Sequence, residues 1–199
     1  MKNIVIFGAS GQTGKYIVRK IQSVPEFKVS VFVRNPEKLS DVDLENVNVI
    51  QGDTLKPEDV KKAMIGQDAL LASLEGDVLT MANNIVAALS QTSVKRIIWI
   101  TGFGIHNEIK GIRGKMLAVY VKSNPDYIKA ADTIAASNAV TTLLRCPMIQ
   151  DGNNEDYFLT KEGEQHRNKD VDRASIAKCM ADMLLDESIG VNDSLAITN

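Results

Sequence analysis

Residues 7–14 read FGASGQTG, with three glycines spaced three residues apart directly after the apolar run IVIF. Glycine weakens both strands and helices, so its repetition at this point requires a local reason. Between a strand and a helix, Gly8 would allow a sharp turn, Gly11 would let a pyrophosphate approach the backbone, and Gly14 would let the helix pack closely. N–H groups at the helix start would bind the phosphates, with side-chain donors from Ser10, Gln12 and Thr13.

The end of the second predicted strand favours one of the two nicotinamide dinucleotides. In NAD-preferring proteins an acidic residue about 20 positions beyond the glycines binds the ribose 2′-hydroxyl. Here that count reaches Arg34, and the first carboxylate is Glu37. A guanidinium could bind a 2′-phosphate with two hydrogen bonds, and Lys38 could join it. We therefore expect NADP(H) rather than NAD(H), although solvated loop charges would give the same pattern.

The elements around the glycines have the order that a dinucleotide-binding turn requires. Residues 3–7 are apolar apart from Asn3, as in a central parallel strand, and 16–24 change to helical spacing before Pro25. The same alternation predicts strands over 28–33, 47–51, 68–73, 95–101, 140–145 and 194–198, and helices from 57, over 78–91, 124–137 and 172–185. Strands separated by helices imply one α/β domain over 1–199, a Rossmann-like doubly wound, mostly parallel sheet with helices on both faces.

The spacing G-x-x-G-x-x-G, in the form GASGQTG, resembles the atypical short-chain dehydrogenase/reductases, specifically their NmrA-like NAD(P)H-binding group. The resemblance covers nearly the whole chain, and it includes VFVRNPEKL, GD at 52–53, WITGFGI, KAADTIAAS and LLRCP. It implies a Rossmann core with a small C-terminal substrate region. Members of the family are reductases of small molecules or non-catalytic sensors of cofactor state.

The resemblance also implies cofactor contacts at the ends of the third and fourth strands. Asp53, followed by Thr54, matches the family residue beside the adenine, although Asp53 could also cap the turn before Pro57. Loops at the carboxyl ends of parallel strands contact the cofactor, which adds Ser73 and Leu74. The surrounding ASLEG matches the glycine-rich family stretch only loosely.

A substrate-side loop is expected over 146–170, where no regular element is predicted. Its composition is polar and acidic, with a single Tyr-Phe pair. Pro147 is the residue of this loop that we expect near the nicotinamide. In the family an arginine and a proline are usually adjacent here, whereas Cys146 separates Arg145 from Pro147 in this chain.

The expected catalytic residues are only partly present. Many short-chain dehydrogenases use a tyrosine and a lysine at i and i+4, on one helix face, with a serine on the preceding strand. Lys129 matches the lysine and could hold the nicotinamide ribose, but the position four residues earlier is Pro125, which has no hydroxyl. Tyr127 would lie on nearly the opposite face from Lys129. Thr101 stands where the serine is expected, and it is equally an ordinary strand residue.

Two other side chains could supply the proton. His106 lies just past the fifth predicted strand, and an unperturbed histidine, with a pKa of about 6.5, could pass a proton. Tyr120 precedes the predicted helix. Either could equally be an exposed residue without such a role. Two function classes therefore remain: an NADP(H)-dependent reductase of a quinone, flavin or reactive carbonyl, or a non-catalytic NADP(H)-binding regulator that senses redox state. The lack of an added interaction domain favours the reductase.

Composition argues against several other classes of protein. The net charge is −2 and basic residues cluster only in pairs, which argues against nucleic-acid binding. The first apolar run is too short for a signal peptide, and no apolar stretch could span a membrane. Two cysteines and two histidines without ligand spacing predict no metal site. We expect a cytoplasmic monomer or homodimer with reduced thiols that acts on a small-molecule substrate.

Overall fold

The central sheet of the computed structural model contains eight strands in the part of the chain that the structure describes, residues 1–105, 123–164, 167 and 169–199. The strands are β1 (Lys2–Phe7), β2 (Phe27–Val33), β3 (Val47–Gln51), β4 (Ala69–Ala72), β5 (Arg96–Gly102), β6 (Val140–Cys146), β8 (Phe158–Lys161) and β10 (Asp193–Thr198). Their order is β3-β2-β1-β4-β5-β6-β10-β8, and only the β10–β8 pair is antiparallel. The predicted doubly wound, mostly parallel fold is confirmed.

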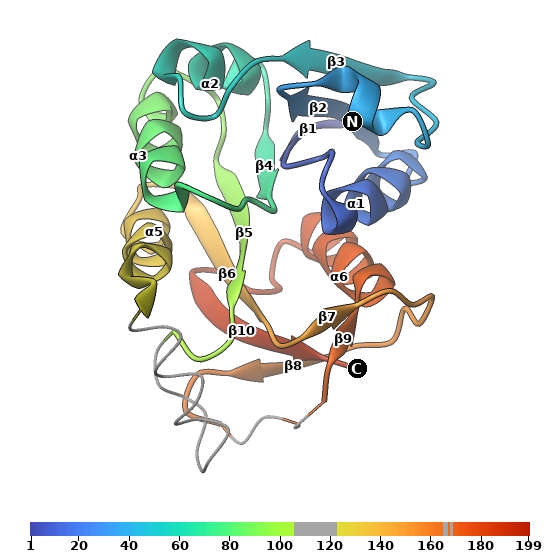
Figure 1. Cartoon of the computed structure of the whole chain (residues 1–199), viewed down its shortest axis with the longest axis vertical. Helices are drawn as coiled ribbons and strands as arrows, with labels where there is room; N and C mark the ends of the chain where they lie inside the picture. The colour runs from blue at the N-terminus through green and yellow to red at the C-terminus, as the bar shows by residue number, and fades with distance from the viewer. Residues whose placement is uncertain (106–122, 165–166, 168) are drawn as a thin grey trace.

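Helices cover both faces of this sheet. On one face α1 (Gln12–Gln22) packs against α6 (Arg173–Leu185), and the other face carries α2 (Pro57–Met64), α3 (Val78–Leu89) and α5 (Pro125–Ala135), as Figure 1 shows. A short 3₁₀ helix, η1 (Pro36–Leu39), follows β2. Both α2 and α5 begin at a proline, whose fixed φ and missing N–H suit the first helical turn. None of the helices described here combines the length and apolar character needed to cross a bilayer.

The central strands are largely apolar because both faces of the sheet are buried. In β1, Ile4 and Ile6 belong to the core between the sheet and the α1/α6 pair, while Val5 and Phe7 belong to the core under α2, α3 and α5. All four side chains are fully buried. This double burial distinguishes a parallel sheet from an antiparallel sheet with one wet face.

The segment without a predicted element contains short strands instead of an irregular loop. β7 (Ile149–Gln150) pairs in parallel with β9 (Val171–Asp172), and β8 adds an antiparallel edge to the sheet through β10. Strands of two to four residues are too short to show an alternating pattern, and their pairing partners lie far away in the sequence. The expectation of no regular element over 146–170 was therefore wrong.

Candidate functional site

The carboxyl ends of the parallel strands bring the predicted site residues to one edge of the sheet. In the order β3, β2, β1, β4, β5, the residues at these ends are Asp53, Arg34, Gly8, Ser73 and Thr101. The winding direction reverses between β1 and β4, and open α/β sheets bind ligands in the crevice at such a switch point. The glycine turn therefore lies at the centre of this edge.

The three glycines of this turn have different surroundings. Gly8 has a φ of +79°, and a Cβ there would lie 1.9 Å from the Ser73 carbonyl oxygen. A Cβ on Gly14 would lie 2.1 Å from the Gly8 carbonyl oxygen. Gly11 has φ −72° and ψ 165°, which any residue can adopt, and its Cβ would approach nothing closer than 3.3 Å. The fold itself needs Gly8 and Gly14, whereas a Cβ on Gly11 would have one close neighbour, the Gly8 carbonyl oxygen at 3.3 Å.

The start of α1 has the properties of an anion site. Gly11 is its N-cap, no side chain caps it, and its first turn contains no acidic residue. The first N–H groups of a helix have no intrahelical partner and lie at the positive end of the dipole. Ser10 is half-buried and Thr13 is buried at this end. Together, these features fit the pyrophosphate of a dinucleotide.

The end of β2 presents two cationic side chains to solvent. Arg34 is exposed, and within the described residues its guanidinium has no hydrogen bond or ion pair. Its carbonyl oxygen accepts a 3.2 Å bond from Gln51 Nε2, which holds the backbone to the end of β3. Lys38 is exposed in η1, whose first turn is capped by Asn35. A 2′-phosphate could reach both cations, so their role toward NADP(H) stays a prediction.

At the end of β3, Asp53 serves the local turn. Its Oδ1 accepts from the Leu55 N–H at 3.0 Å, and its own N–H donates to Asp59 Oδ2 at 3.0 Å. Thr54 is buried, and its carbonyl oxygen accepts a 2.9 Å bond from Asn84 Nδ2 on α3. These contacts establish the turn that the sequence suggested, while contact of Asp53 and Thr54 with an adenine stays a prediction.

The end of β4 lies against the glycine turn. The Ser73 N–H donates to the Phe7 carbonyl oxygen at 3.1 Å, and the Ser73 carbonyl oxygen occupies the space where a Gly8 side chain would be. Leu74 is half-buried and packs on the core beneath α3. The two residues therefore border the crevice at the switch point, which is where we expected cofactor contacts.

At the end of β5, Thr101 has an unusual environment. Only 5% of the residue is exposed, and its Oγ1 has no hydrogen-bond partner among the residues that the structure describes. Buried hydroxyls nearly always have a partner, and leaving one without costs about 1–3 kcal/mol. The strand register places Arg145 of β6 opposite Thr101, and Arg145 Nε donates to Ser194 Oγ at 2.9 Å. The Thr101 hydroxyl is thus a buried polar group that no described residue satisfies.

The helix expected to carry catalytic groups begins at Pro125, so no hydroxyl lies one turn before Lys129. Lys129 Nζ lies 3.1 Å from Asp126 Oδ1, and both side chains are more than half exposed. Exposed pairs of this kind contribute at most about 1 kcal/mol, so the lysine can exchange its partner readily. Tyr127 is half-buried against the core. Its phenol does not share the exposed side of α5 with Lys129.

The sequence predicted three further residues on the substrate side. Pro147 is half-buried directly after β6, at the same edge of the sheet. His106 and Tyr120, the two alternative proton donors, lie outside the described residues.

Burial raises the pKa of the Cys146 and Cys179 thiols well above the ordinary value, and both cysteines are free. Both thiols therefore stay protonated and unreactive at neutral pH.

Arg173 also lies at the candidate site, next to the glycine turn, and the sequence analysis did not predict it. Its Nη2 donates to Gln12 Oε1 at 2.7 Å, and its Nη1 donates to Asp151 Oδ1 at 2.9 Å. The contact joins the first residue of α6 to the first residue of α1, 161 positions earlier in the chain. No local pattern could have indicated it, because it depends on the two helices sharing one face of the sheet.

Comparisons with known proteins cover nearly the whole chain. A family model described as NAD(P)H-binding matches residues 8–187. A Rossmann-fold NAD(P)-binding family protein from Shigella flexneri has 30% sequence identity and a TM-score of 0.84, over 100% of this chain and 94% of that one. A short-chain dehydrogenase/reductase from Veillonella parvula in complex with NADP has 24% identity and a TM-score of 0.83, over 100% and 94%. ChuY, an anaerobillin reductase from Escherichia coli, has 15% identity and a TM-score of 0.81, over 99% and 97%.

Proposed function

This chain belongs to the NAD(P)H-binding family, and we propose that it is an NADP(H)-dependent reductase that transfers hydride to a flavin, a quinone or a reactive carbonyl compound. The observation that carries the proposal is the start of α1, which has no side-chain cap and no acidic residue in its first turn, on the same sheet edge as the buried Thr101 hydroxyl, which has no partner among the described residues. β5 lies two strands from β1, about 10 Å at the usual strand spacing. This separation suits a dinucleotide with its pyrophosphate at Gly11 and its nicotinamide near Thr101.

The chain's own groups would bind and orient the reactants. When bound, the reduced nicotinamide would supply the hydride. The N–H groups at the start of α1 would hold the pyrophosphate, and Lys129 would exchange Asp126 for a ribose hydroxyl. The Thr101 hydroxyl would donate a hydrogen bond that fixes the ring or the acceptor. Within the described residues, α5 has a proline instead of a hydroxyl-bearing residue four positions before Lys129, which favours acceptors whose reduced form water can protonate.

Arg34 is expected to set the preference for NADP(H) over NAD(H). We expect the parent protein to bind NADP(H) at least about tenfold more tightly, a difference of about 1.4 kcal/mol. Arg34→Ala should remove most of this preference because a 2′-phosphate would lose its bidentate partner. Lys28→Ala is the control, since Lys28 is an exposed cation near the start of the same strand. Calorimetry that gave the parent equal affinities for both cofactors would contradict the prediction.

Thr101→Val is expected to separate a binding role of the hydroxyl from a structural one. The replacement keeps the β-branched shape and removes a buried hydroxyl that has no partner among the described residues. Stability to urea should therefore stay equal or rise by about 1 kcal/mol. NADPH oxidation with flavin mononucleotide (FMN) should slow by about three- to tenfold, the value of one hydrogen bond. Lower stability with unchanged turnover would show that the hydroxyl serves only the fold.

A further inference from the structure

The helices α1 and α6 pack together on one face of the sheet (Figure 1), and their first residues meet. The meeting point is the 2.7 Å bond from Arg173 to the Gln12 side chain. Gln12 belongs to the turn whose N–H groups would hold the pyrophosphate. Arg173, the first residue of α6, therefore contacts the proposed cofactor site, although it comes from the C-terminal part of the chain.

The guanidinium of Arg173 is buried and only partly hydrogen-bonded. The residue is only 9% exposed, and among the residues that the structure describes its buried Nε has no hydrogen-bond partner. Its carboxylate partner, Asp151, is 76% exposed and lies on a connecting segment. A guanidinium buried to this extent is costly unless its charge and N–H groups are satisfied. An anionic pyrophosphate on the adjacent turn would add a second negative charge beside the guanidinium, next to that of the exposed Asp151.

The segment that carries Asp151 is anchored on the first turn of α6. Gln150 Nε2 donates to Asp172 Oδ1 at 2.8 Å, and the Asn154 N–H donates to Asp172 Oδ2 at 3.2 Å. Ser175 Oγ lies 2.7 Å from the Asn154 carbonyl oxygen and 3.0 Å from that of Asp156. We call residues 150–157 the substrate-side segment. These hydrogen bonds attach the segment to the N-terminus of α6.

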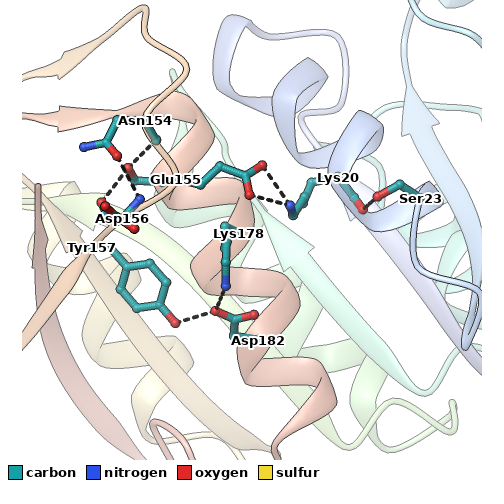
Figure 2. A network of polar contacts seen from close by, with 9 residues as sticks. Lys20, Ser23, Asn154, Glu155, Asp156, Tyr157, Lys178 and Asp182 are labelled. Carbon is teal, nitrogen blue, oxygen red and sulfur yellow. Dashed lines mark hydrogen bonds and ion pairs between the residues drawn. The ribbon is translucent and has the colours of Figure 1, made fainter.

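The same segment continues along both helices. Figure 2 shows Glu155 reaching Lys20 of α1, with an ion pair of 2.8 Å, and the Tyr157 hydroxyl donating to Asp182 of α6 at 2.7 Å. These contacts lie further from the glycine turn than the contact of Arg173. Within the described residues, only the Asp151–Arg173–Gln12 chain of contacts connects the substrate-side segment directly to the glycine turn.

We propose that Arg173 is a positioning residue that couples the cofactor turn to the substrate-side segment, so that bound NADP(H) further restrains residues 150–157. A pyrophosphate beside Gln12 stabilises the guanidinium where it stands, and the guanidinium in turn holds Asp151. Coupling of this kind is reciprocal, so a restrained segment also strengthens cofactor binding. The proposal rests on the proposed function for the identity of the cofactor and for the role of the segment toward substrate.

The test is backbone hydrogen–deuterium exchange with and without NADP⁺, which needs no turnover. In the parent, NADP⁺ should slow exchange over 150–157 by about fivefold or more, a usual size for coupling. Asp151→Asn should abolish this slowing while NADP⁺ remains bound, and Asp151 is exposed enough that the fold is not at risk. Glu155→Gln is the matched control: it removes one charge from the same segment but leaves Arg173 untouched, so the slowing should persist.

Arg173→Gln should lose both properties, with NADP⁺ affinity lower by about tenfold, the value of a charged hydrogen bond. For Asp151→Asn, the KM for FMN should rise while kcat changes little, which a purely structural role would not produce. Equal slowing in the parent and in Asp151→Asn would overturn the proposal, as would bound NADP⁺ that leaves exchange over 150–157 unchanged. Slowing without any NADPH oxidation would instead refute the reductase and leave the coupling intact.

Discussion

Replacing Gly11 with valine is expected to lower NADP(H) affinity by about 100-fold or more, equivalent to about 2.7 kcal/mol, while the protein stays folded. The backbone of Gly11 suits any residue, and a Cβ there meets no atom closer than 3.3 Å. The valine side chain would instead fill the space where the pyrophosphate approaches the N–H groups of α1. Calorimetry with NADP⁺ measures the affinity, and thermal unfolding reports on the fold.

Gly14→Ala is the contrasting variant for this experiment. Its methyl group would lie 2.1 Å from the Gly8 carbonyl oxygen, so either the turn or α1 must move. We expect it to destabilise the protein by about 1–3 kcal/mol, as overpacking commonly does. If Gly11→Val bound NADP⁺ as tightly as the parent, the glycines would serve only the turn, and the cofactor site would have to lie elsewhere.

Acceptors that need no protein acid are expected to react far faster than simple ketones. A positioned general acid typically contributes about 10²–10⁴-fold, or roughly 3–5 kcal/mol of barrier. Because Pro125 stands four residues before Lys129, the hydroxyl that would protonate an alkoxide from that position is absent. Reduced flavins and quinones are stabilised anions that water can protonate. The kcat/KM values for FMN and menadione should therefore exceed that for cyclohexanone by a factor in this range.

Variants of the two alternative proton donors would explain the opposite outcome, in which the ketone reacts as fast as the flavin and the quinone. Brisk reduction of cyclohexanone would mean that a proton donor exists, and His106→Ala and Tyr120→Phe would then identify it. Lys129→Ala should slow turnover with every acceptor, because the lysine is expected to position the nicotinamide ribose and not to donate a proton. A loss confined to ketones in Lys129→Ala would contradict this positioning role.

The parts of the fold that the sequence predicted are those with local signals. The apolar runs of the central strands and the glycine spacing at 8, 11 and 14 are visible within a few residues, and the fold they predicted is confirmed. Parallel topology then places the residues after each strand at one edge of the sheet. Arg34 and Ser73 are brought to the same edge for this reason, although their roles toward a cofactor stay predictions.

What the sequence could not predict depends on distant partners or on atomic distances. β7 and β9 have two residues each and exist only through their mutual pairing. The contact of Arg173 with Gln12 joins opposite ends of the chain. Likewise, Gly11 and Gly14 cannot be told apart in the sequence, because both are glycines of the same motif. Only the positions of neighbouring atoms show that a Cβ would clash at Gly14 and would not clash at Gly11. The lack of a partner for Thr101 among the described residues is visible only in the packed structure.

The central claim is that NADPH bound at the glycine turn gives hydride to a flavin or quinone, and anaerobic oxidation of NADPH tests it most directly. With FMN as acceptor and absorbance recorded for both compounds, we predict equal amounts of NADPH oxidised and FMN reduced, in a reaction that Gly11→Val abolishes. The same equality should hold for menadione. Parent protein that binds NADPH tightly, yet oxidises it with neither FMN nor menadione, would contradict the claim and favour a cofactor-sensing regulator.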